Sequence, residues 1–158
     1  MSGSIPRIVL DTNVCLDLFV FDDPGVARLR DALRGGEVEA MTDAPCREEW
    51  RRVLAYPALA LPETRQSAAL AEFDRLTTPC DEDALPAPAD ALRLPRCRDP
   101  DDQKFLELAL RSGTRWLLTR DDHLLALGRR TAREGWFAIL TPQEWLAEQT
   151  AGAQGPRP

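Results

Sequence analysis

The chain has 158 residues, of which 44% are hydrophobic and 29% are charged, and its formal net charge is −6 at pH 7. This length predicts one domain, and the composition disfavours a disordered chain, a collagen-like chain and a coiled-coil rod. The acidic balance excludes a uniformly basic nucleic-acid-binding domain, but it allows an enzyme whose acidic residues hold cations. No apolar run approaches the roughly 20 residues of a membrane span, so no membrane partner is expected.

The cysteines and the N-terminal residues indicate the compartment. Four cysteines are present without CxxC spacing, and His123 is the only histidine, which disfavours a zinc site. The first residues lack the apolar segment of a secretory signal. We therefore expect a cytoplasmic protein with reduced cysteines.

Hydrophobic spacing and helix breakers predict the elements of the first half of the chain. In chain order they are a buried strand at 8–10, a helix at 14–20, a turn at 22–25, a helix at 26–33, a strand at 38–42, and helices at 45–55 and 62–76. Asn13 is expected to cap the first helix, and Gly35 and Gly36 to end the second.

The second half begins with an irregular, proline-rich stretch at 77–100, expected to hold one short strand and one short helix. The elements after it are a helix at 101–111, a strand at 115–119, a helix at 122–127, a strand at 137–140 and a helix at 142–149. We assign 1–150 to one domain and 151–158 to a frayed tail. Because strands alternate with helices, we expect an α/β fold with three α/β/α layers around a central parallel sheet.

Acidic residues cluster where a parallel sheet binds its ligands, beyond the carboxyl ends of the strands. They are Asp11, Glu48, Glu49, Asp99, Asp101, Asp102, Asp121 and Asp122. Several carboxylates at one sheet edge repel one another, and a divalent cation removes that repulsion. An all-oxygen site with room for water favours Mg²⁺ or Mn²⁺.

Helical phase selects between neighbouring acids. Glu49 borders the apolar stripe of its helix, whereas Glu48 points nearly opposite. Asp102 continues the buried stripe that begins at Phe105, and a buried carboxylate needs a partner. We therefore expect Asp102 to be functional, with helix capping and dipole compensation as the alternative, and we expect Asp101 to serve in capping and dipole compensation.

The acids after the first and third strands are assigned by position. Because Asn13 is expected to cap the first helix, Asp11 is left for the site. Asp121 is nearer the sheet edge than Asp122, so we assign Asp121 to the site and Asp122 to capping. His123 is expected to be a surface residue, with phosphate binding as the alternative.

Four sequence blocks together resemble a PIN domain. They are Leu10–Val14 (LDTNV), Arg47–Leu54 (REEWRRVL), Asp99–Ala109 (DPDDQKFLELA) and Leu117–Asp121 (LLTRD), in the order and spacing of that family. The resemblance spans residues 8–146 and is closest to the toxin components of toxin–antitoxin systems (VapC-like ribonucleases). It implies an Mg²⁺- or Mn²⁺-dependent nuclease that acts on RNA, built on a parallel sheet flanked by helices.

The resemblance also implies roles for single residues. The family's metal-binding and catalytic acids fall on Asp11, Glu49, Asp102 and Asp121, and its small polar residues near the metal fall on Asn13 and Thr119. His123 departs from the pattern, since many relatives carry another acid there, and the number of metal ions stays open. A cognate antitoxin that covers the groove and a homodimer are the implied protein partners.

Arginines are needed to hold an RNA backbone next to so acidic an edge. The candidates are Arg47, Arg51, Arg52, Arg120, Arg129 and Arg130, each with a solvated helix face as the alternative. Two other functions stay open. One is a phosphotransferase of the haloacid dehalogenase type, which normally carries a second Asp where this chain has Asn13. The other is a non-catalytic module that binds nucleic acid or protein.

Overall fold

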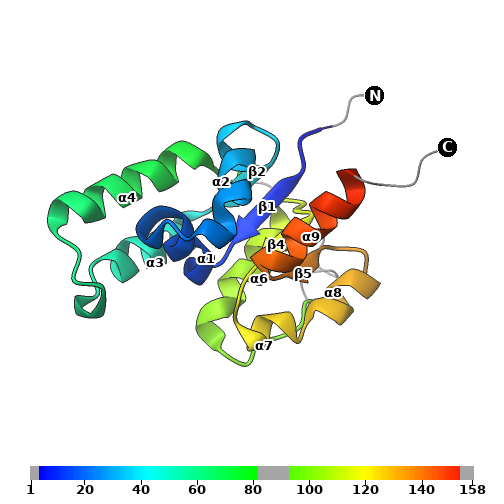
Figure 1. Cartoon of the computed structure of the whole chain (residues 1–158). Coiled ribbons are helices and arrows are strands. Elements are labelled where there is room, and N and C mark those ends of the chain that lie inside the picture. The colour runs from blue at the N-terminus through cyan, green and yellow to red at the C-terminus, as the bar shows by residue number, and fades with distance from the viewer. Residues whose placement is uncertain (1–3, 82–92, 154–158) are drawn as a thin grey trace.

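A parallel sheet of five strands forms the centre of the computed structural model, which describes residues 4–81 and 93–153 (Figure 1). The strands are β1 (Arg7–Leu10), β2 (Glu39–Thr42), β3 (Thr77–Pro79), β4 (Trp116–Leu118) and β5 (Ala138–Leu140). Their order is β3-β2-β1-β4-β5, and every neighbouring pair is parallel. The predicted α/β fold with a central parallel sheet is confirmed.

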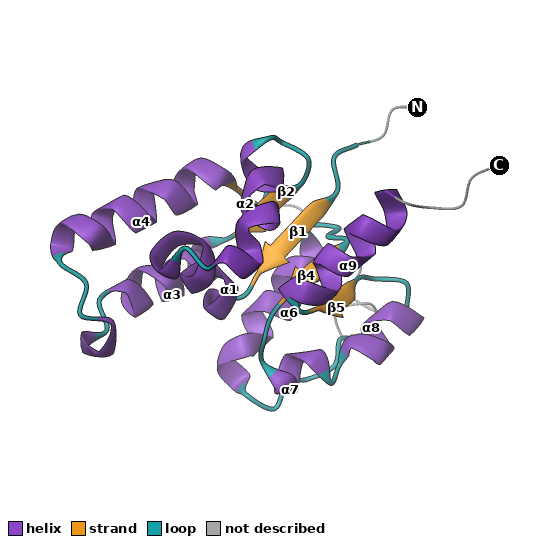
Figure 2. Ribbon diagram, viewed as in Figure 1, coloured by secondary structure: helices purple, strands orange, loops and turns teal. Residues whose placement is uncertain are grey.

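Helices cover both faces of this sheet (Figure 2). They are α1 (Thr12–Leu16), α2 (Ala27–Arg34), α3 (Ala44–Leu54), α4 (Glu63–Leu76), α6 (Gln103–Arg111), α7 (Asp122–Leu125), α8 (Gly128–Arg133) and α9 (Pro142–Ala153). A π-helical turn, Asp17–Phe21, extends α1, and 3-10 turns lie at Pro24–Val26, Pro57–Leu59 and Pro100–Asp102. None of the helices in the described ranges has the length and apolar character needed to cross a membrane.

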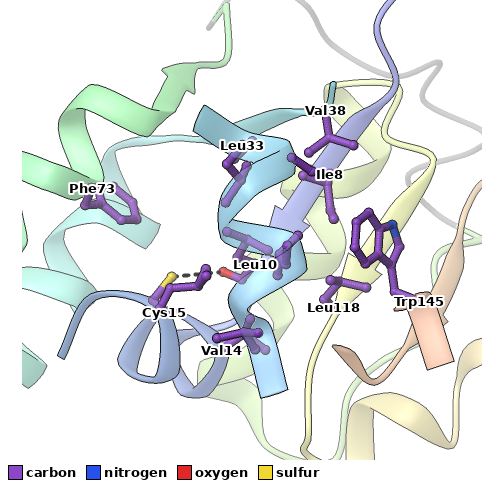
Figure 3. Close-up of a cluster of buried hydrophobic side chains, with 14 of the residues drawn as sticks. Ile8, Leu10, Val14, Cys15, Leu33, Val38, Phe73, Leu118 and Trp145 are labelled. Atoms are coloured by element: carbon purple, nitrogen blue, oxygen red, sulfur yellow. Dashed lines mark hydrogen bonds between the residues drawn. The ribbon is translucent and has the colours of Figure 1, made fainter. Parts of the chain in front are cut away.

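Alternating side chains of the strands divide the core into two layers, one on each face of the sheet. On one face, Ile8, Leu10 and Leu118 lie in a cluster with Leu33 of α2 and Trp145 of α9 (Figure 3). On the other face, the residues between them, Val9 and Leu117, pack with the buried stripe of α6. The three-layer arrangement follows from this alternation.

Three parts of the chain differ from the sequence-based expectation. Helix α8 was not predicted, because Thr131 is its only buried residue and it therefore has no apolar stripe. The proline-rich stretch contributes the edge strand β3, while 82–92 lie outside the described residues. Helix α9 continues to Ala153, so only 154–158 of the expected tail lie beyond it, outside the described residues.

The strand order places a crevice beside the central strand. From β1 the chain passes to β2 on one side of the sheet, and it later returns to β4 on the other side. The connections after β1 and β4 therefore leave in different directions, and open α/β sheets bind ligands at such a switch point. The carboxyl end of β1 points toward α1, α3 and α6 (Figure 1), which carry or adjoin the predicted acids.

Candidate active site

Asp11 lies at the centre of the crevice. It follows β1, is 4% exposed, and its Oδ2 accepts a hydrogen bond from the Thr119 hydroxyl at 2.7 Å. Its Oδ1 accepts from the backbone N–H of Thr12 at 2.6 Å, which makes Asp11 the N-cap of α1. The prediction that Asn13 caps this helix is wrong, because Asn13 is already inside it. The Asn13 amide instead donates to Asp11 Oδ2 at 3.4 Å.

Thr119 connects Asp11 to Asp121. Its buried hydroxyl donates to Asp11 and accepts from the backbone N–H of Asp121 at 2.9 Å. Asp121 also caps α7, since its Oδ1 accepts from the N–H of His123 at 3.0 Å. The assignment of that cap to Asp122 is therefore wrong. The Asp121 side chain therefore caps α7 and also lies at the sheet edge, where it was predicted.

Asp102 ends the 3-10 turn before α6, and its carboxyl group is hydrogen-bonded to that of Asp121. Burial, followed by this bond and the charge of Asp11, raises the pKa of Asp102 to about 8. The same bond holds the pKa of Asp121 below its usual value. The turn itself is capped by Asp99, which accepts from the N–H of Asp101 at 3.0 Å, so Asp101 is not the cap.

Glu49 of α3 faces the same crevice, as its helical phase predicts. Its Oε1 pairs with the Lys104 ammonium, and its Oε2 accepts from the Thr12 hydroxyl. Glu48 points to solvent, where it pairs with Arg51. The Glu49–Lys104 pair thus connects α3 with α6 at the carboxyl end of the sheet.

All four predicted acids line one open cleft of about 470 Å³. Part of its lining is apolar: Leu16, Val53, Tyr56, Ala58 and Leu59. We call these five residues the apolar lining. The cleft therefore presents hard oxygen ligands next to a hydrophobic surface that includes one aromatic ring.

The cleft concentrates negative charge in a poorly hydrated place. Burial raises the pKa of Asp11 to about 6, and the charges of Glu49 and Asp121 act in the same direction. The hydrogen bonds from Thr119 and Thr12 oppose this rise. A rise of this kind at a cleft marks a functional site more often than a structural one.

Comparison with known families agrees with this geometry. The model of the PIN domain family matches residues 7–123, which include β1 through the first turn of α7. The chain belongs to the PIN domain family. No curated protein matches the chain significantly. Because PIN domains are generally metal-dependent nucleases, membership gives this chain a nuclease-type fold.

The donor set of this PIN domain fits a hard divalent ion such as Mg²⁺ or Mn²⁺. The raised pKa values of Asp102 and Asp11 show how poorly the cleft tolerates its charges without a cation. As the side chains of the described residues lie, no three of them surround one point closely enough to hold an ion. Asp102 is hydrogen-bonded to Asp121, and Glu49 is paired with Lys104.

The predicted RNA-contacting arginines differ in how they are engaged. Arg47 makes a bidentate pair with Asp74 at 2.8 Å, Arg51 pairs with Glu48, and Arg120 pairs with the buried Asp17 at 2.9 Å. Arg130 donates to a backbone carbonyl at 2.8 Å. Arg52 and Arg129 make no side-chain hydrogen bond or ion pair within residues 4–81 and 93–153. Arg52 lies one helical turn from Glu49, which makes it the best placed of these two.

Lys104, which contacts the cleft acid Glu49, was not among the residues predicted from the sequence. It lies two positions after Asp102 on the same helix, and its long side chain reaches Glu49 on α3. One signal was present in the sequence. Lys104 is the only lysine among 20 basic residues, so it stands apart from the arginine bias of the chain.

Proposed function

We propose that this PIN domain is a metal-dependent endoribonuclease that hydrolyses RNA phosphodiester bonds. The observation that carries the proposal is the convergence of Asp11, Glu49, Asp102 and Asp121 on one cleft at the switch point of the sheet. Each acid comes from a different segment of the chain. An acidic cleft repels RNA unless cations neutralise it, so this donor set makes chemical sense with a bound divalent ion.

Asp11, Asp102 and Asp121 would hold Mg²⁺ or Mn²⁺, and Glu49 would contribute directly or through water. When bound, the ion supplies a water of lowered pKa and charge stabilisation for the phosphate. The chain's own part is to fix the ligands. Thr119 and the N–H of Thr12 orient the Asp11 carboxylate, and Asn13 supports it from the side.

Substrate would lie across the cleft with its phosphate at the acids and its bases toward the apolar lining. Unpaired bases stack on aromatic rings, and Tyr56 is 53% exposed. Arg52 on α3 offers the phosphate backbone a cation that no acidic side chain of the described residues already holds. This arrangement suits a single strand better than a duplex, whose bases are already stacked.

The finer assignment to the toxin of a type II toxin–antitoxin pair rests on the resemblance of the four sequence blocks. It entails a cytoplasmic protein, a cognate antitoxin over the cleft and self-association. Growth arrest on induced expression, absent for D11N and relieved by the product of a small neighbouring gene, would support it. Growth unaffected by active enzyme would leave a nuclease with another role.

The test of the nuclease activity uses three substrates with Mn²⁺: single-stranded RNA, single-stranded DNA and a phosphomonoester. We expect internal cleavage of the RNA, loss of activity in D11N, and loss in EDTA. Hydrolysis of the phosphomonoester alone would support the phosphotransferase, although Asn13 stands where that class has its second Asp. RNA binding without cleavage by the wild type, unchanged in E49Q and D102N, would support the non-catalytic module.

A further inference from the structure

Several contacts hold Lys104 beside the cleft. Its side chain is 19% exposed, its ammonium pairs with Glu49 Oε1, and it donates to the backbone carbonyl of Asp101. The ammonium also lies 5.3 Å from the ring centroid of Phe105. The Lys104 side chain therefore extends from α6 to α3, where its ammonium is held beside Glu49, one of the acids that line the cleft.

These contacts divide the acids into two groups. Glu49 has both oxygens engaged, one by Lys104 and the other by the Thr12 hydroxyl. Asp11, Asp102 and Asp121 contact one another or Thr119, and no arginine or lysine of the described residues contacts them. The nearest basic group is the His123 imidazole, whose Nδ1 is 3.9 Å from Asp121. Of the four predicted acids, Glu49 is therefore neutralised by Lys104, while the other three have no lysine or arginine of the described residues in contact with them.

We propose that the Lys104 ammonium serves as a built-in cation, so that the cleft takes up one divalent ion, among Asp11, Asp102 and Asp121, rather than two. The inference rests on the proposed metal-dependent function. Two-metal sites hold their ions about 3.5–4 Å apart between shared carboxylates. An ammonium fixed beside Glu49 would repel a second metal ion at that carboxylate. The ammonium has three hydrogen-bond donors but no lone pair, so it cannot itself bind a metal.

Lysine suits this role better than arginine. An ammonium is a compact point charge that fits beside one carboxylate oxygen, whereas a guanidinium is a wide planar fork. Arginine is used at all 19 other basic positions of the chain. Because Lys104 acts through Glu49, it is a positioning residue, and its test must measure the ion rather than the rate.

The test counts Mn²⁺ ions by titration, following the loss of the free-ion signal in electron paramagnetic resonance. We expect one ion per chain in the wild type and two in K104M, which keeps the apolar stem but removes the charge. K104R should remain at one, since it restores the charge. R51M is the matched control, because it removes the cation of the solvent-facing Arg51–Glu48 pair, and it should also bind one.

The outcomes separate this inference from the proposed function. Two ions in the wild type, or one in both the wild type and folded K104M, would overturn the proposal that Lys104 is a built-in cation. Either result would leave the nuclease proposal intact. No ion in any variant would overturn both. Thermal melting checks that K104M is folded. If K104M does not fold, K104Q is the second neutral variant.

A measurement on the wild type needs no variant. Because Lys104 is the only lysine, ¹³C-lysine labelling gives one side-chain signal in nuclear magnetic resonance. We expect the Cε shift to stay near its metal-free value when Mg²⁺ is added, since the ammonium stays on Glu49. A shift to the value of an unfolded chain would show that the ion displaces Lys104, which contradicts the proposal.

Discussion

Asp11 combines structural and chemical tasks that oppose each other. It caps α1 and accepts from Thr119, yet burial raises its pKa from 3.8 to about 6. An acid with a raised folded-state pKa favours folding only while protonated, so its ionisation costs stability as the pH rises from about 4 to 6. One pKa unit corresponds to about 1.4 kcal/mol, so the full cost above pH 6 is about 3 kcal/mol.

Replacing Asp11 by Asn should therefore stabilise the protein while abolishing activity. We expect D11N to raise the free energy of unfolding by about 1–3 kcal/mol at pH 7.5 and by less than about 1 kcal/mol at pH 4. Urea unfolding at the two pH values measures this. The control is D43N, because Asp43 is also an N-cap with a largely covered side chain but pairs with Arg111, and D43N should destabilise. A D11N protein that is less stable than wild type at pH 7.5 contradicts the prediction.

The Asp102–Asp121 pair predicts how metal binding depends on pH. The pKa of Asp102 is raised to about 8, so below that pH an ion must displace a proton from this carboxyl group. We expect a fixed Mg²⁺ concentration to raise the melting temperature more at pH 8.5 than at pH 6.5, with Mg²⁺ affinity up to about tenfold tighter per pH unit below 8. D102N should lose most of this dependence. A pH-independent shift would mean that the pair is not a ligand.

At the scale of elements, the two neighbouring arginines of α3, Arg51 and Arg52, differ in whether an acidic side chain of the described residues pairs with them. Arg52 follows Glu49 by three positions, whereas Arg51 is paired with Glu48. R52A should weaken binding of single-stranded RNA by about fivefold, or roughly 1 kcal/mol, through loss of a phosphate contact. R51A should change it by less than about twofold. Fluorescence anisotropy with D121N as the background, so that no cleavage occurs, compares the two. Equal losses of RNA affinity in R52A and R51A would mean that the RNA phosphate backbone does not contact Arg52 specifically.

Just beyond α3, Tyr56 tests the apolar lining. If bases stack there, Y56A should weaken binding of an unpaired strand by about 5- to 100-fold, since one stacked base contributes about 1–3 kcal/mol. Y56F keeps the ring and should bind within about twofold of wild type. The same variants should leave Mg²⁺ affinity unchanged, because Tyr56 holds no ion. Loss of binding in Y56F as well would assign the contact to the hydroxyl group.

The elements also show what the sequence could predict. The strands and the amphipathic helices were predictable because burial imposes a period, and the same phase placed Glu49 inward and Glu48 outward. The caps were predicted less well. Asp11 and Asp121 each fill a cap and face the cleft, so assigning one role per residue moved the caps to Asn13 and Asp122. Lys104 was missed because its contact with Glu49 exists only once α6 lies beside α3.

At the scale of the whole molecule, the net charge disfavours the binding of RNA, whereas a metal ion in the cleft would favour it. The chain carries a net charge of −6, and three of its predicted RNA-contacting arginines are held by acidic side chains. Long-range attraction of RNA should therefore be weak, and in the proposed nuclease a bound ion would supply much of the local attraction. This distinguishes the protein from a basic RNA-binding domain, which binds its ligand without metal and loses affinity steeply with salt.

RNA binding should accordingly depend strongly on the divalent ion and weakly on monovalent salt. For D121N, Ca²⁺ or Mg²⁺ bound by the remaining acids should support measurable binding, which EDTA removes. Between 50 and 200 mM KCl the slope of log affinity against log salt should be about −1, since about one or two phosphates are neutralised at roughly −0.7 each for single strands. Anisotropy titrations at fixed ion concentration give this slope, with D11N/D121N as the control that binds no ion. Tight binding in EDTA with a slope of −4 or steeper would show that a basic surface, rather than the acidic cleft, receives the RNA.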